Sequence, residues 1–118
     1  MVEFVLVFPV LALILFAVVQ FGIVFHNYVT LTDAVRAGSR QAAVGRHLSD
    51  PEGAAEDRVR ESAANLDQSK LVVDVQAPAV WLPGEDVTVE ATYPYSINLL
   101  GIVVASGDLT SKTTERVE

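Results

Sequence analysis

The sequence contains no cysteine, which excludes disulfide bonds, thiolate catalysis and cysteine-based metal sites. Basic residues are also few, because eight lysines and arginines stand against fifteen aspartates and glutamates, giving a net charge of −7. A surplus of carboxylates is not attracted to nucleic acid or to an anionic lipid surface, so we predict no nucleic-acid partner. If the folded part lies outside the cytoplasm, its stability comes from packing or assembly and not from disulfides.

Patterns typical of catalysis are missing as well. His26 and His47 lie far apart, and the chain has no His-x-x-x-His spacing, no phosphate-binding glycine loop and no paired carboxylates near a nucleophile. We therefore predict that the protein is not an enzyme and has no catalytic, cofactor-binding or metal-binding residues. No cofactor is implied.

Charged side chains are absent from Phe4 to Phe25, and Glu3 stands at the front edge of this run. A helix formed by residues 4–25 is about 33 Å long, and the hydrocarbon core of a bilayer is about 30 Å thick. The helix is therefore long enough to cross a bilayer. The run raises the mean hydropathy of the whole chain to +0.38. We predict a single membrane-spanning helix at the N-terminus.

Two alternatives to a membrane span fit the sequence less well. A cleaved signal peptide requires a basic n-region, a shorter apolar core and a small-residue cleavage site, whereas this run is preceded by Glu3 and followed by bulky Val24 and Phe25. A buried core helix would need far more surrounding protein than the rest of the chain provides. Both alternatives are disfavoured.

The orientation in the membrane is ambiguous. Arg36, Arg40 and Arg46 follow the span and no basic residue precedes it, so the positive-inside rule places them in the cytoplasm. A basic leader upstream of Met1 would reverse this count and place residues 27–118 outside the cytoplasm.

Helical spacing continues beyond the span. Residues 26–44 contain no proline, and Gly45 is expected to end the helix. A second helix is predicted from Ser49 or Asp50 to about Leu66, with either a Ser49–Glu52 capping box or a cap by Asp50 followed by Pro51. The apolar face of this helix is formed by Ala55, Val59, Ala63 and Leu66. Glu56 and Arg60 are expected to form an exposed ion pair.

From residue 70 the apolar period changes from helical to two. One face of the first strand is formed by Leu71, Val73 and Val75, which alternate with Val72, Asp74 and Gln76. A turn is predicted at 83–86, and a second strand begins at Val87. Val87, Val89, Ala91 and Tyr93 are expected to face inward, and residues 109–117 form a less regular third strand. The apolar stretch 97–105 fits a strand, a helical turn or an exposed contact patch.

The predicted fold class is therefore α+β, with a long N-terminal transmembrane helix, a second helix and a small antiparallel β-sheet. We divide the chain into a transmembrane helix (residues 1–26), a helix extension out of the membrane (27–48) and a small extracytoplasmic α+β domain (49–118).

Three stretches in this order resemble the TadE-like family, the pilin-like subunits of the tight-adherence (Tad) type IV pilus of bacteria. They are Val2-Glu3-Phe4 running into an apolar segment with Phe8-Pro9, residues 31–43, and residues 84–94 with Gly84-Glu85-Asp86 and Thr92-Tyr93-Pro94. The resemblance implies a prepilin precursor cut by a prepilin peptidase after a glycine, with a glutamate as fifth residue of the mature chain and an aromatic after it. Here Glu3 is third and no glycine precedes it, so either a basic leader and two mature residues are missing or the chain is not processed.

The resemblance also implies roles for individual residues. Glu3, with Phe4 after it, would pair with the N-terminal amine of a neighbouring subunit, and the alternative is a carboxylate that stabilises its own helix N-terminus. Pro9 is expected to kink or start the helix, Gln20 and Gly22 lie where a partner helix can approach, and Arg36 and Arg40 form a basic helix face. For Gln20 and Gly22 the alternative is simple tolerance near the end of the span. For the arginines it is pairing with Asp33 or a lipid headgroup.

The expected function is that of a minor pilin or pseudopilin, anchored in the bacterial cell membrane, that assembles through its first helix into a Tad pilus and supports pilus biogenesis and adhesion. Its partners would be the membrane, other pilin-like subunits in a homo- or hetero-oligomeric filament, platform proteins and the prepilin peptidase. Two alternatives are the major filament subunit and a single-pass membrane protein with a binding domain that never assembles.

Overall fold

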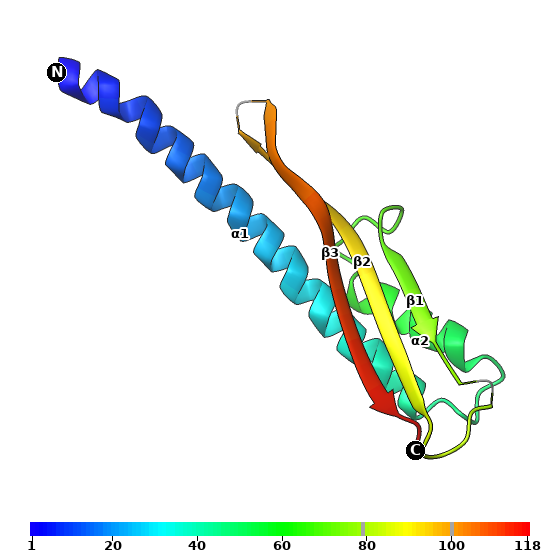
Figure 1. Ribbon diagram of the computed structural model, residues 1–118. Coiled ribbons are helices and arrows are strands. Elements are labelled where there is room, and N and C mark those ends of the chain that lie inside the picture. Colours follow the sequence, from blue (N-terminus) through cyan, green and yellow to red (C-terminus); the bar gives the residue numbers. More distant parts are fainter. Residues whose placement is uncertain (79, 100) are drawn as a thin grey trace.

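A computed structural model describes residues 1–78, 80–99 and 101–118. The elements are α1 (Val2–Ala43), α2 (Pro51–Ser62), β1 (Val72–Gln76), β2 (Asp86–Leu99) and β3 (Ile102–Arg116). They form a molecule 71 Å long and only 22 × 19 Å across, in which α1 extends well beyond the remaining elements (Figure 1). The α+β class, with a long apolar helix, a second helix and an antiparallel sheet, is confirmed.

Helix α1 is continuous from the apolar run into the folded body. It ends at Ala43, and Gly45 follows directly after the C-cap residue Val44, as the sequence predicted. Pro9 lies inside the helix, so of the two expected outcomes, a kink or a helix start, the helix start is wrong. Its missing N–H leaves the preceding turn one hydrogen bond short without ending the helix.

The capping of α2 distinguishes the two sequence-based alternatives. The Asp50 side chain accepts a hydrogen bond from the Gly53 N–H at 3.1 Å, and Pro51 occupies the first turn. The capping box on Ser49 is therefore wrong. The Glu56–Arg60 pair is confirmed, with 3.2 Å between Arg60 Nε and Glu56 Oε1.

The predicted end of α2 at Leu66 is also wrong, because the helix ends at Ser62. The chain turns after Ala63, and the Gln68 side-chain amide donates a hydrogen bond to the Ala63 carbonyl oxygen at 2.9 Å. Ala63 and Leu66 are nevertheless both buried, as their position on the predicted apolar face required.

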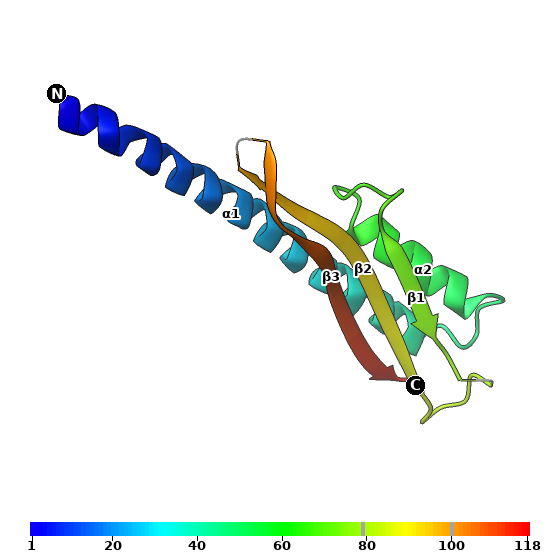
Figure 2. The same cartoon turned by 45° about the horizontal axis from the view of Figure 1, so that its top comes forward.

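The three strands form one antiparallel sheet in the order β1-β2-β3. Val87, Val89 and Ala91 are fully buried and Tyr93 is half-buried, so the predicted inward face is confirmed. β1 pairs only with Thr88–Thr92, whereas β2 and β3 continue as a hairpin toward the N-terminal half of α1 (Figures 1 and 2). The ambiguous stretch 97–105 forms the distal part of that hairpin, apart from Leu100, which lies outside the described residues.

The core lies between the C-terminal half of α1, α2 and the sheet. Its largest fully buried side chains are Leu31, Val35, Val59, Val87, Val89, Val117 and Ser39. The last residue closes this unit, because the Glu118 N–H donates a hydrogen bond to the Ala43 carbonyl oxygen at 3.0 Å. The C-terminal half of α1 is thereby fixed in the body while its N-terminal half projects from it.

Candidate assembly surface

The projecting half of α1 leaves its apolar side chains uncovered. No residue of its most apolar window is buried, and it is the one helix in the described part of the chain that is long and apolar enough to cross a membrane. Phe4, Phe8, Leu15 and Phe21 are each more than half exposed. Soluble proteins rarely expose apolar patches above a few hundred Å², so this surface is built to be covered by lipid or by protein.

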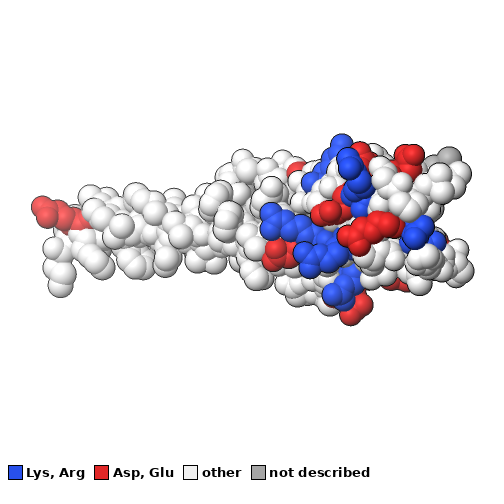
Figure 3. Space-filling view, turned by 90° about the horizontal axis from the view of Figure 1, so that it is seen from below, with Lys and Arg blue, Asp and Glu red and all other residues white. Residues whose placement is uncertain are grey.

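Charged side chains gather on the body and, apart from Glu3, are absent from the projecting half of α1. Glu3 is the only charged side chain before Asp33. Figure 3 shows basic and acidic side chains gathered over the end of the molecule that contains α2 and the sheet, with an uncharged stretch between them and the acidic tip. The structure therefore separates a charged body from an uncharged helical stalk.

Glu3 lies in the first turn of α1, where the helix dipole favours a negative charge. Met1 is the N-cap residue and provides no side-chain cap. The ion pairs in the described residues join Arg58 to Glu61, Arg60 to Glu56 and Arg116 to Asp86, and none involves Glu3. Phe4 follows it, with its ring centroid 5.9 Å from that of Phe8.

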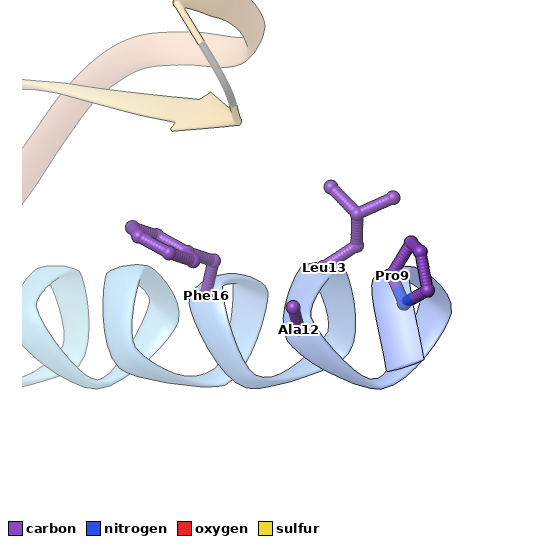
Figure 4. A pocket seen from close by; sticks show the side chains of 4 residues that line it. All are labelled: Pro9, Ala12, Leu13 and Phe16. Carbon is purple, nitrogen blue, oxygen red and sulfur yellow. The ribbon is translucent and has the colours of Figure 1, made fainter. Parts of the chain in front are cut away.

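A shallow hollow marks the position of Pro9. Its volume is about 220 Å³, and it is lined by Pro9, Ala12, Leu13 and Phe16. Figure 4 shows the rings of Pro9 and Phe16 and the Leu13 side chain projecting from the helix, with the small Ala12 between them. The lining is almost entirely apolar, so the hollow suits an apolar side chain and not a polar ligand.

Gln20 and Gly22 lie farther along the same stalk. Gln20 is half-buried, and a Cβ placed on Gly22 would meet no atom within 4 Å. The surface beside Gly22 is therefore open within the chain itself.

Arg36 and Arg40 are both exposed, one helical turn apart, where the stalk meets the body. Arg36 lines a surface hollow with Tyr28 and Asp33, and Arg40 lines another with Arg58. The structure thus brings a third arginine, from α2, to this basic face. Sequence reasoning missed Arg58 because the pairing of α1 with α2 was not known.

Metal-binding side chains do not gather on this surface. Within the described residues no group of three or more histidines, aspartates or glutamates lies close enough to hold a metal ion. The predicted site residues are instead spread along one helix: Glu3, Phe4, Pro9, Gln20 and Gly22 on the stalk, and Arg36 and Arg40 where it joins the body. The stalk is a surface for lipid or protein contacts.

Comparison with known proteins agrees with this geometry. Residues 1–40, which include the whole stalk, match the family described as TadE-like protein. Over this segment the chain is similar to the TadE-like family, and the match covers 40 of its 118 residues. Together with the exposed apolar helix, the similarity points to a Tad pilus-associated protein that is associated with the membrane. No curated protein and no solved structure matches the chain.

Proposed function

We propose that this protein is a pilin-like subunit, of the minor-pilin or pseudopilin class, that is held in the bacterial membrane by α1 and assembles through the same helix into a Tad pilus. In this proposal residues 1–26 span the membrane, residues 27–48 extend the helix outward, and the body within residues 49–118 lies outside the cytoplasm. The prepilin peptidase, platform proteins and other pilin-like subunits are its partners.

One observation carries the proposal: the TadE-like segment contains the apolar stalk, and none of the residues in its most apolar window is buried by the rest of the chain. Lipid covers such a helix in the membrane, and the helices of other subunits cover it in a filament without any change in its chemistry. The uncovered surface therefore suits a subunit that passes from one environment to the other.

Glu3 can fix the position of one subunit relative to its neighbour when the helix passes from the membrane into the filament. In apolar surroundings an unpaired carboxylate is costly, and an amine from a neighbouring subunit removes that cost. Because Glu3 is the single charge on the stalk, such a pair would fix one register between neighbouring helices. Arg36 and Arg40 would form a basic face on the helix extension beyond the span.

Photo-crosslinking tests the assembly of the stalk. The natural chain has no cysteine, so Leu15→Cys provides a single attachment site for a benzophenone maleimide on an exposed side chain of the stalk. In cells that make the pilus and also carry an epitope-tagged second copy, we expect light-dependent adducts between the labelled chain and the stalk of another subunit. Adducts to lipid alone, in cells with and without pili, would show a plain membrane anchor.

A further inference from the structure

The distal part of the β2–β3 hairpin, residues 94–107, extends beyond the body. β1 ends its pairing at Thr92, and beyond that point the two strands continue without a third strand beside them in the described residues. Residues 91–107 contain no charged side chain. The hairpin runs along the uncharged stalk of α1 (Figures 1 and 2).

An apolar groove separates the hairpin from the stalk. It has a volume of about 430 Å³ and an almost entirely apolar lining, which consists of Ile14, Ala17, Val18 and Phe21 from α1 and Ile97, Leu99 and Val104 from the hairpin. The helical residues follow three- and four-residue steps and so form one stripe. We refer to this space as the stalk groove.

A β-bulge places one of the valines in this groove. Ile97 pairs with Ala105 and Asn98 pairs with Val103, which makes Val104 the extra residue of β3. Val104 lines the stalk groove, whereas Val103 pairs with the exposed Asn98. Val104 and Val103 are almost equally exposed, at 55% and 56%, and they differ in that only Val104 lines the stalk groove.

Lipid is a poor occupant of the stalk groove. If residues 4–25 span a bilayer, Ile14 lies about 16 Å inside the edge marked by Phe25, and the hairpin tip lies beside it. Within the described residues no further strand pairs with the outer edge of β2 beyond Thr92 or with the outer edge of β3. Open sheet edges do not occur in contact with hydrocarbon. The hairpin position therefore fits a stalk that is surrounded by protein.

We propose that the stalk groove receives the uncharged segment 4–25 of α1 from a second copy of this chain. The inference rests on the proposed assembly of α1 and adds the hairpin as a second contact. The occupant matches the groove in chemistry, because both are apolar and free of charge. The contact joins two different surfaces, a groove and a helix, and is therefore heterologous. Repeated heterologous contacts build an open helical filament when the rotation from one subunit to the next does not close a ring.

The matched valines test this contact. A benzophenone maleimide is attached to Val104→Cys or to Val103→Cys in the full chain, in cells that make the pilus and carry a tagged second copy. We expect Val104→Cys to give several-fold more adducts with the tagged copy than Val103→Cys, and peptide mapping to locate them within residues 4–25 of that copy.

The Leu15→Cys label separates this inference from the proposed function. If Leu15→Cys reaches a second copy while Val104→Cys reaches only lipid or its own chain, assembly holds and the groove contact is wrong. Equal yields from the two valines overturn it as well. If Leu15→Cys itself never reaches another subunit, both proposals fail.

A charge in the groove provides a second test that needs no label there. We expect Val104→Asp to lower copy-to-copy crosslinking from Leu15→Cys several-fold, because the carboxylate would have to be buried against an uncharged helix. Val103→Asp should leave the yield unchanged. Equal yields in the two variants would overturn the groove contact.

Discussion

Gly38 of α1 lies directly against Val59 of α2. A Cβ at position 38 would overlap the Val59 side chain and stand 3.1 Å from the Ala55 carbonyl oxygen. Val59 itself is fully buried. The missing side chain of Gly38 therefore sets how closely the two helices approach, and it fixes α2 on the part of α1 that joins stalk to body.

Gly38→Ala should destabilise the body by about 1–3 kcal/mol, because the added methyl group forces Val59 or the α2 backbone to move. Gly22→Ala is the matched control in the same helix, since a Cβ there meets nothing within 4 Å. The control should be neutral or stabilising by up to about 1 kcal/mol from helix propensity. Denaturant unfolding of the full chain in detergent measures both, and equal effects would show that the close helix contact is wrong.

Val89→Asp should cost about 3 kcal/mol or more, because it places an unpaired carboxylate at a fully buried position of β2. Val72→Asp, on a strand valine that is 61% exposed, should change stability by about 0.5 kcal/mol or less. Thermal unfolding followed by circular dichroism compares the two. If the Val89 variant unfolds at the same temperature as the natural chain, the inward face of the sheet has been assigned wrongly.

Asp50→Ala should cost about 1 kcal/mol through the loss of the α2 cap, whereas Ser49→Ala should be nearly neutral. The difference follows from the hydrogen bond between Gly53 N–H and the Asp50 carboxylate. Unfolding free energies of the two variants measure it. A larger loss at Ser49 would restore the capping-box interpretation.

Asp67 should titrate below the ordinary aspartate range. The Ser69 hydroxyl donates to its carboxylate at 2.6 Å and the Ser69 N–H donates at 3.0 Å, and these bonds lower the pKa of Asp67. A lowered pKa in the folded state adds stability that is complete above the unfolded-state pKa and is lost as the pH falls through the folded-state value.

Ser69→Ala should therefore raise the pKa of Asp67 and reduce this acid-sensitive contribution. Carboxyl chemical shifts followed by NMR over an acid titration measure the change. An unchanged Asp67 titration in the variant would show that the serine bonds do not govern it.

The sequence predicted the elements whose periodicity is uninterrupted. The apolar stalk, the cap-and-proline start of α2 and the alternating face of Val87 and Val89 each arise from local spacing, and each is found. The predicted end of α2 was wrong because Ala63 and Leu66 are buried although they follow the end of the helix. Their apolar side chains continued the helical spacing beyond the helix itself.

The hairpin could not be placed from spacing alone. Pro94 interrupts the pattern of β2, and residues 97–105 are apolar without regular alternation, so neither face nor register was determined. The register is set by cross-strand pairs such as Ile97 with Ala105, and the bulge at Val104 shifts it. The stalk groove depends on both, as well as on the position of the hairpin along α1.

The central claim is that the stalk assembles the protein into the pilus through Glu3. The most direct measurement is the amount of chain in sheared pili and in membranes for the natural protein, Glu3→Ala and Glu3→Asp. We expect Glu3→Ala to enter the membrane normally, because removal of a charge favours insertion, yet to be lost from pili, with Glu3→Asp intermediate because its carboxylate reaches less far. Equal recovery of all three chains in the pilus fraction would contradict the account.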